Sequence, residues 1–531
     1  MSQYQAPAKT INQPIAHLGF VKLVLFIYPL LFFGDALDAY NIGPIPIAWL
    51  SKIAFIALAF IIFFASRFVT FPLIVLGGLT LFWATIVSLL NLDAANAYNF
   101  SSLQLSVRYP FFIILRFFSI IAFISVGYVT FWLLVQNNRE KMIKLIVWMG
   151  VLASLLAFYI YFAQLFGFSE LARNRTGTTG SAQQVIFSSL PGVYYLRAMG
   201  TFREPSFFAA WLIIPFFLSY IYKKSLFNLP AFIISTAILL SWSLSCILAI
   251  IIASGLALLF GLVMTYKTEK IRVKSLINVA LRLSIPFLLA LILAQIASSA
   301  LFHYGQKEIG ARVHESRKTN IGKNISTFYA ALLKTSSKDS HKLSAIKAAY
   351  WDENPNNYKG SKILYARVQQ LMKTKFADSD RGYVYKYVMD QSIPVLGQGL
   401  GNANITFSQY LFDNFFYSSR DNNNNGRLPP VSFLSLYINF AYSVGWIGLG
   451  LLIILLAFPV AILLIKKVNS TIFYNNVFYL LSAYFAWLIM FATVFEELTQ
   501  SFAVISAFLI YALKQENFLL KIGKEKKIYP S

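Results

Sequence analysis

The chain has 531 residues, of which 58% are hydrophobic and 12% are charged. Soluble domains carry about 25% charged residues, so this composition excludes a soluble globular protein and predicts an integral membrane protein. Lysine and arginine together number 45 against 21 aspartate and glutamate residues, which gives a net charge of +24 at pH 7. Such an excess either orients the chain through its cytoplasmic loops or serves an anionic substrate.

Metal and nucleotide chemistry have no signature in the sequence. The single cysteine, Cys246, permits no intramolecular disulfide, and the four histidines are too scattered to form a ligand pattern. The chain contains no Walker A motif and no dinucleotide-binding glycine motif at the start of a helix. We therefore expect no metal site and no cofactor, and we interpret the polar N-terminal segment as lacking a cleaved signal peptide.

Twelve apolar segments are candidates to cross a bilayer, which takes about 20 residues each. They are 18–36, 46–66, 69–91, 109–135, 144–167, 206–222, 227–244, 246–266, 277–300, 444–465, 472–494 and 499–513. The long apolar run 227–266 is divided because residues 241–245 read Ser-Trp-Ser-Leu-Ser, and 431–442 is interpreted as a tilted or interfacial segment. The predicted fold class is an all-α integral membrane protein with about 12 transmembrane helices.

The short loops predict the orientation, because lysine and arginine concentrate on the cytoplasmic side. With twelve spans, the basic loops such as 139–144 and 267–274 all fall on one side together with both termini. The domains are then 1–300 with nine helices, a large loop at 301–430, 431–513 with three helices, and a basic cytoplasmic tail at 514–531. The opposite side receives the loop 168–205 and the large, mainly helical loop 301–430, which has 18 basic and 10 acidic residues.

The first candidate site directly precedes the span at 206–222. It contains Arg197, Arg203 and Glu204, followed by a proline that is typical of a helix start. Guanidinium groups bind phosphate oxygens through paired hydrogen bonds, and a neighbouring carboxylate can accept a proton. The same residues also suit an ordinary helix N-terminus. Two further arginines of this loop either strengthen its positive field or are solvated, namely Arg173 and Arg175.

Three further motifs lie on the same predicted side. Arg381 begins an apolar-periodic helix that leads to a glycine-rich turn, where exposed N–H groups such as that of Gly399 can contribute to an anion site. The hydroxyls of 241–245 either bond the local backbone or take part in a site. Glu496 and Glu497 are either interfacial charges or carboxylates that orient an arginine.

The order of these motifs resembles the O-antigen polymerase and ligase superfamily, of the Wzy and exopolysaccharide-polymerase type, over roughly residues 168–510. The resemblance rests on Phe202-Arg-Glu-Pro-Ser-Phe-Phe-Ala-Ala, on Pro394-x-x-Gly397-x-Gly399-x-Gly401-Asn402, and on Pro429-Pro430-Val431-Ser432 before Gly445-x-x-Gly448. It implies a GT-C-like, metal-independent membrane glycosyltransferase whose substrates are undecaprenyl-diphosphate-linked oligosaccharides. The resemblance also implies membrane lipids and a chain-length-regulating protein as partners, and no nucleic acid.

The resemblance assigns roles to individual residues. The family's essential arginines correspond best to Arg203 and Arg381. On sequence grounds Glu204 is the best-placed carboxylate, and it either accepts a proton or holds Arg203 in place. Supporting contacts to diphosphate or sugar are expected from Arg197, Arg427 and Tyr383.

These features favour a surface-glycan repeat-unit polymerase in the bacterial inner membrane, with its active site facing the periplasm, as in lipopolysaccharide biosynthesis. The ligases carry a histidine before the span that follows the large loop, whereas this chain reads Pro430-Val431-Ser432 there. An O-antigen ligase, a lipid-linked glycan flippase or transporter, and a structural assembly subunit are the alternatives.

Overall fold

The computed structural model describes residues 18–43, 45–66, 72–91, 103–166, 185–187, 194–266, 277–294, 380–415, 431–465 and 476–514. This part of the chain is mostly helical, and nine of its helices are long and apolar enough to cross a membrane. Three shorter apolar helices cover 229–240, 478–493 and 500–512. Each of these helices overlaps one of the predicted segments, so the expectation of a multi-pass, α-helical membrane protein is confirmed.

The first half of the chain contains α1 (Leu18–Asp35), α2 (Ile47–Ser66), α3 (Leu73–Leu90), α5 (Leu103–Val135) and α6 (Arg139–Phe166). Two antiparallel ribbons interrupt the helices: β1 (Asn41–Ile42) pairs with β2 (Ile45–Pro46), and β3 (Val185–Phe187) pairs with β4 (Tyr194–Leu196). The second half contains α8 (Pro205–Tyr222), α9 (Leu229–Leu240), α10 (Leu244–Tyr266), an unlabelled helix Ile277–Ala294, α15 (Asp380–Asp390), α16 (Asn402–Phe415), α17 (Leu436–Ile465), α19 (Phe478–Thr493) and α20 (Gln500–Lys514).

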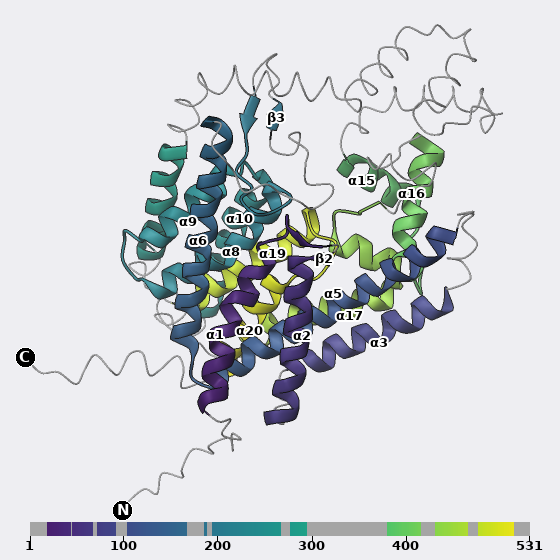
Figure 1. The fold of residues 1–531 in the computed structure, drawn as a ribbon, viewed down its shortest axis with the longest axis horizontal. Helices are drawn as coiled ribbons and strands as arrows, with labels where there is room; N and C mark the ends of the chain where they lie inside the picture. The colour runs from purple at the N-terminus through teal and green to yellow at the C-terminus, as the bar shows by residue number, and fades with distance from the viewer. Residues whose placement is uncertain are drawn as a thin grey trace, which may run out of the picture.

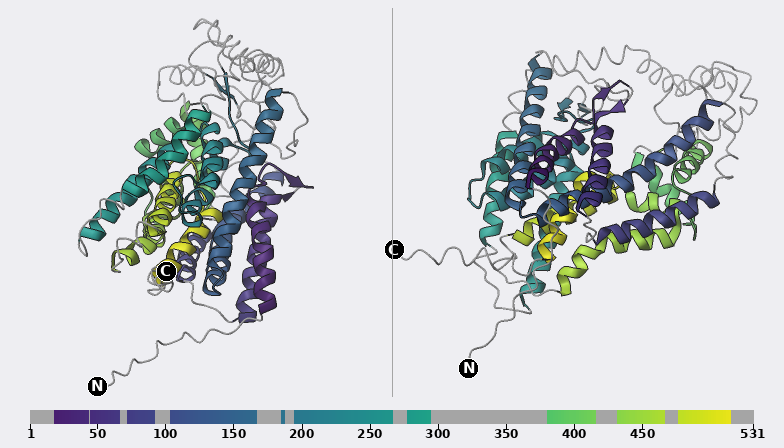
Figure 2. Two further views of the ribbon diagram at one scale, coloured as in Figure 1. Left: turned by 90° about the vertical axis from the view of Figure 1, so that its left-hand side faces the viewer. Right: turned by 60° about the horizontal axis from the view of Figure 1, so that its bottom comes forward.

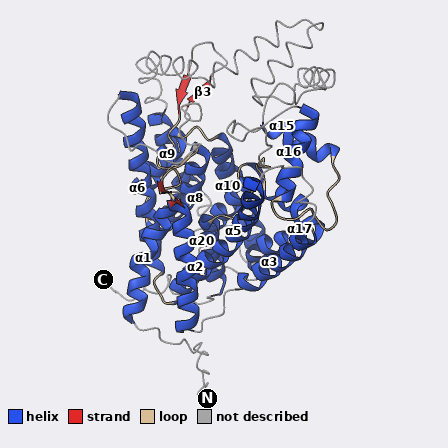
Figure 3. Cartoon of the chain, turned by 45° about the vertical axis from the view of Figure 1, so that its right-hand side comes forward, coloured by secondary structure: helices blue, strands red, loops and turns tan. Residues whose placement is uncertain are grey.

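The helices form two neighbouring groups (Figure 1). Helices α1, α6, α8 and α9 stand together on the left of that view, whereas α3, α5 and α17 form an oblique group on the right. Helix α19 contacts both α8 and α17, and helix α20 contacts both α8 and α5, so these two helices join the two groups. Figure 2 shows the same helices from two further directions, and Figure 3 shows that strands contribute only the short ribbons among the described elements.

Helix α8 is the most enclosed of the nine long apolar helices. It packs against α6, α9 and α19, and 83% of its apolar window is buried, compared with 33% for α1 or α2. Its sequence is apolar on every face, as expected for a helix that meets protein rather than lipid on all sides. The charged residues Arg203 and Glu204 therefore directly precede a helix that is surrounded by protein.

The predicted division of the run 227–266 is confirmed, because α9 ends at Leu240 and α10 begins at Leu244. Trp242 adopts a positive φ of 50° in this turn. The hydroxyl of Ser241 donates to the oxygen of Ile238 at 2.6 Å and accepts from the N–H of Ser243 at 3.2 Å. The serine hydroxyl therefore satisfies the local backbone, which was the first of the two interpretations of this motif.

Helix α17 is broken at Gly445, where φ is 69°, close to the predicted boundary between 431–442 and 444–465. The glycine-rich segment after α15 lies in this break. The N–H of Gly399 donates to the oxygen of Ser443 at 2.8 Å, and a Cβ on Gly397 would lie 2.5 Å from the nitrogen of Gly445. The two backbone segments approach each other so closely that Gly397 and Gly445 must both be glycine.

Candidate active site

A cavity of about 850 Å³ lies among helix ends and the connections between them. Its wall includes the end of α1, the starts of α2, α8 and α20, one turn of α5, and the segment between α19 and α20. Sites that enclose small ligands commonly have volumes of about 300–1,000 Å³. The charged residues on the wall are Asp35, Asp38, Lys52, Arg203, Glu204, Glu496 and Glu497.

Arg203 is held on this wall by the connection between α1 and α2. Its Nε donates to Oδ2 of Asp38 at 2.7 Å. The backbones are joined as well, because the N–H of Ala39 donates to the oxygen of Thr201 at 3.0 Å and the Thr201 hydroxyl donates to the oxygen of Ala36 at 2.6 Å. The guanidinium side chain is 36% exposed, and its terminal nitrogens have no hydrogen-bond partner among the described residues. They are available to a ligand in the cavity.

Glu204 occupies the N-cap position of α8, and Pro205 is the first helical residue. The Glu204 carboxylate does not cap the helix; instead it accepts a long hydrogen bond of 3.4 Å from the hydroxyl of Ser206. Burial raises the pKa of Glu204 above its ordinary value, although the charge of Arg203 opposes this effect. A carboxylate with a raised pKa is a better proton acceptor near neutral pH than an ordinary surface glutamate.

Arg197 is not among the residues that line the cavity, but it lies near Glu204. Its Nε donates to the carbonyl oxygen of Ser241 at 3.0 Å, and the neighbouring N–H of Ala198 donates to the oxygen of Leu240 at 2.9 Å. Burial lowers the pKa of Arg197, and the charge of Glu204 acts against this. Arg197 therefore fixes the turn between α9 and α10 and contributes positive potential near Glu204, without lining the described cavity.

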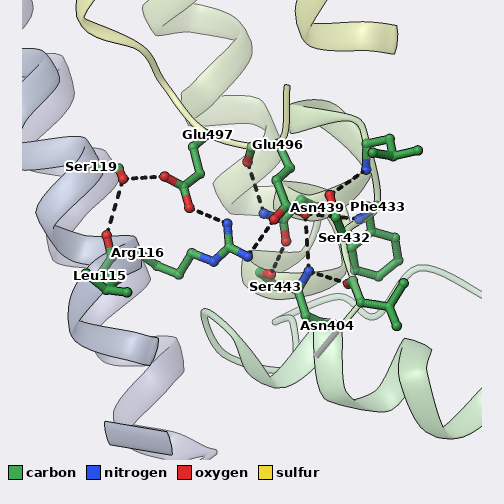
Figure 4. Close-up of polar contacts among 12 residues, drawn as sticks. Leu115, Arg116, Ser119, Asn404, Ser432, Phe433, Asn439, Ser443, Glu496 and Glu497 are labelled. Atoms are coloured by element: carbon green, nitrogen blue, oxygen red, sulfur yellow. Dashed lines mark hydrogen bonds and ion pairs between the residues drawn. The ribbon is translucent and has the colours of Figure 1, made fainter. Parts of the chain in front are cut away.

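A buried ion pair that has no local motif in the sequence lies beside the cavity (Figure 4). Nη2 of Arg116, in α5, is 2.6 Å from Oε1 of Glu496, and Nη1 binds Glu497. Glu497 also accepts a hydrogen bond from Ser119, one turn further along α5. One of the two interpretations of the glutamates, that they orient an arginine, is therefore confirmed. The sequence feature that could have identified Arg116 as a site residue is its position inside the apolar segment 109–135, where an ionisable residue is costly to bury.

Glu496 joins several parts of the chain at one point. Its Oε2 accepts the N–H of Phe433 at 3.0 Å and Nδ2 of Asn404 at 3.3 Å, and its backbone oxygen accepts Nδ2 of Asn439 at 3.1 Å. Figure 4 shows these contacts converging from α16, α17 and the segment before α17. Glu496 therefore ties the α15–α17 region to α5 through Arg116.

The second predicted arginine helix is present as α15, and Arg381 is its second residue. The ring of Tyr383 is buried in an aromatic cluster with Tyr387, Phe407 and Phe433, and Phe433 adjoins the cavity-lining residues 432 and 434. The predicted sugar contact of Tyr383 would require its ring to be exposed, whereas the structure places it in this core.

Gly399 was expected to present its N–H to an anion. In the structure this N–H is engaged by Ser443, so the glycine turn anchors the break in α17. Three predicted site residues lie outside the described part of the chain, namely Arg173, Arg175 and Arg427. Of the predicted residues whose side chains are described, Arg203 and Glu204 are brought together on the cavity wall.

Within the described residues, no group of three or more His, Cys, Asp or Glu side chains is arranged to hold a metal ion. Comparisons of the chain with known protein families, with curated proteins and with solved structures gave no match.

Proposed function

We propose that this protein is a polysaccharide repeat-unit polymerase that transfers a glycan from undecaprenyl diphosphate to a hydroxyl of another lipid-linked repeat unit. The observation that carries the proposal is the pair formed by Arg203 and Glu204. A guanidinium with available donors and a buried carboxylate lie side by side at the start of the most enclosed apolar helix, on the wall of the 850 Å³ cavity.

Each step of glycosyl transfer has a group suited to it. The bond between the anomeric carbon and a phosphate oxygen breaks, and negative charge grows on the departing lipid diphosphate. The terminal nitrogens of Arg203 stabilise this charge, with Arg381 as the second cation implied by the family resemblance. The acceptor hydroxyl oxygen forms the new bond to the anomeric carbon, and its proton passes to Glu204.

The position of the cavity supports a transferase over a transporter. Secondary transporters bind substrates near the membrane midplane, at unwound helices. Here the connections that line the cavity join α1 to α2 and α19 to α20, and the cavity also takes in the segment that enters α8. All of these belong to the set predicted to face the periplasm with twelve spans and cytoplasmic termini. A substrate with a lipid tail can therefore present its headgroup at that face of the inner membrane.

The decisive experiment supplies the purified, full-length protein in lipid nanodiscs with an undecaprenyl-diphosphate-linked repeat unit and a metal chelator, without nucleotides. The products are resolved by length. We expect lengthened glycans from the wild-type protein and at least a 100-fold slower reaction for Arg203→Ala and Glu204→Gln. Lys223→Ala is the control, since it removes an exposed cation at the opposite end of α8.

Three results would refute the polymerase. The first is the absence of lengthening by a folded wild-type protein with several repeat-unit structures. The second is transfer of single repeats to a lipid A acceptor, which identifies a ligase. The third is movement of the lipid-linked unit across the bilayer without bond formation, which identifies a flippase. If Lys223→Ala lost activity to the same degree as Arg203→Ala, the effect would not be specific to Arg203, and the proposed role of Arg203 in stabilising the diphosphate would be refuted.

A further inference from the structure

Helix α2 carries a single charged residue, Lys52, and this residue lines the cavity. Lys52 lies in the second turn of a helix that is long and apolar enough to cross a membrane, and its side chain is partly buried. A charged side chain inside a membrane helix is costly, so it usually faces the protein interior and serves a function. The glycosyl transfer described above uses Arg203 and Glu204 but not Lys52, so this lysine needs a separate explanation.

The ammonium group of Lys52 forms no hydrogen bond and no ion pair with any residue of the described part of the chain. It lies within electrostatic range of the carboxylates of Asp35 and Glu497, but it is not in ion-pair contact with either. An ammonium group has three hydrogen-bond donors and no acceptor. These donors are therefore left for water or for acceptor oxygens of a ligand in the cavity.

Lys52 and Arg203 both lie near the end of α1. Asp38 binds Nε of Arg203 at 2.7 Å, and Asp35, the last residue of α1, lies within electrostatic range of both Asp38 and Lys52. The two cations also line the same cavity of about 850 Å³. The lysine side chain is flexible, which lets its ammonium group adjust to the position of a ligand. A ligand with two anionic groups can therefore contact Lys52 with one group and the terminal nitrogens of Arg203 with the other.

The carboxylates around the cavity are largely balanced by arginines. Glu496 and Glu497 are paired with Arg116. Arg197 lies within electrostatic range of Glu204. When these two arginines are counted with the charged wall residues, four cations stand against five carboxylates. The two cations that line the cavity among the described residues are therefore the groups to which an anionic ligand can bind.

We infer that Lys52 is a second phosphate-binding residue of the site and that it makes the site select a lipid diphosphate over a lipid monophosphate. The planar guanidinium of Arg203 binds one phosphate, and the compact ammonium group of Lys52 binds the other. A monophosphate lacks the second anionic group. This inference rests on the proposed function, which supplies the diphosphate, and it adds the residue that recognises the second phosphate. The observations behind it are the unpaired ammonium group of Lys52 and the cavity that it shares with Arg203.

The test measures binding of farnesyl diphosphate and farnesyl monophosphate, two short-chain lipid phosphates, to the full-length protein in nanodiscs. Isothermal titration calorimetry is performed with a metal chelator, and the signal of empty nanodiscs is subtracted. We expect the wild-type protein to bind the diphosphate at least tenfold more tightly than the monophosphate. Lys52→Gln and Lys52→Met should each reduce this ratio to less than about threefold, whereas Lys52→Arg should retain it. Lys223→Gln, which removes an exposed cation at the opposite end of α8 from Arg203, should leave the ratio unchanged.

If Lys52 only neutralised Asp35 and Glu497, Lys52→Gln would weaken both ligands to the same degree, and an unchanged ratio therefore overturns the inference. The absence of a preference in the wild-type protein, or of saturable binding of either ligand, also overturns it. The outcome is separable from that of the polymerase proposal, because binding needs no turnover. If the wild-type protein lengthens glycans and Lys52→Gln keeps the ratio, the polymerase stands and the inference is refuted. If the preference depends on Lys52 in a protein that lengthens nothing, the inference stands and the polymerase is refuted.

Discussion

Replacement of Arg116 by leucine should destabilise the fold more than any other single loss of charge in the described part of the chain. Arg116 is 7% exposed, and it neutralises two carboxylates that are 16% and 34% exposed, Glu496 and Glu497. Without the arginine, both carboxylates remain beside apolar helices with no guanidinium to compensate them. The leucine itself fits the apolar segment, so the cost arises from the unpaired acids.

Removing one partner of a buried ion pair costs about 3–5 kcal/mol. The contribution of Glu497 must be reduced because about a third of its side chain is exposed and its charge is screened by water. The charge of Glu496 is screened less by water, since its side chain is 16% exposed and its other oxygen accepts hydrogen bonds from Phe433 and Asn404. We therefore expect a loss near the lower bound, about 3 kcal/mol.

The assay is thermal unfolding of the purified protein in one detergent, where such a loss lowers the Tm by several degrees. The triple variant Arg116→Leu, Glu496→Gln, Glu497→Gln should recover most of the loss, because replacing a whole buried ion pair is often nearly neutral. Lys144→Leu, which removes an exposed cation of α6, is the control. If Arg116→Leu unfolds at the same temperature as Lys144→Leu, or if the triple variant is no more stable than the single one, the reasoning is wrong.

Gly445→Ala should lower the Tm markedly, because the added Cβ would lie 2.2 Å from a carbonyl oxygen and because a φ of 69° costs alanine about 1–3 kcal/mol. Gly255→Ala should leave the Tm unchanged, since a Cβ at that position would meet open space. Asp38 raises the pKa of Glu204 in addition to burial, so Asp38→Asn should move the acid limb of the kcat/KM profile to lower pH; a shift to higher pH would contradict this. Burial opposes ionisation of Glu497, but the charges of its cationic neighbours hold its pKa below the ordinary value. Its stabilisation is therefore complete above the ordinary glutamate pKa and is lost as pH falls through the lowered one. Glu497→Gln should accordingly flatten the Tm profile on the acid side, below about pH 5, and leave its shape above that pH unchanged.

The helices were predictable from the sequence because a bilayer sets a length that apolar segments must match. The break after Leu240 and the boundary near Gly445 were also visible, through clustered serines and a glycine. The extension of α5 back to Leu103 was not, because residues 103–108 include polar side chains and Arg108. Hydropathy reports the solvent around a segment, and it says little about a helix that continues beyond the apolar part.

The site was predictable only in part. Arg203 and Glu204 were found because they adjoin each other at a helix start, whereas Asp38 lies 165 residues earlier than Arg203 and carries no local motif. Arg116 and Glu496 are separated by 380 residues, so their pairing depends on helix packing that no spacing rule encodes. The glycine turn at 397–401 was detected, but its function in anchoring α17 required the position of Ser443.

The pairing of Arg116 also has a consequence for the order of assembly during synthesis. Arg116 belongs to α5, and its carboxylates follow α19, so a nascent chain carries this guanidinium into the bundle long before its partners are made. Chains that stop before residue 496 retain an unpaired cation near the end of an apolar helix, which is unfavourable in lipid. The segment between α19 and α20 therefore completes the bundle when it is synthesised. Insertions in this segment should reduce the yield of folded protein more than insertions in the connections at the other end of the bundle.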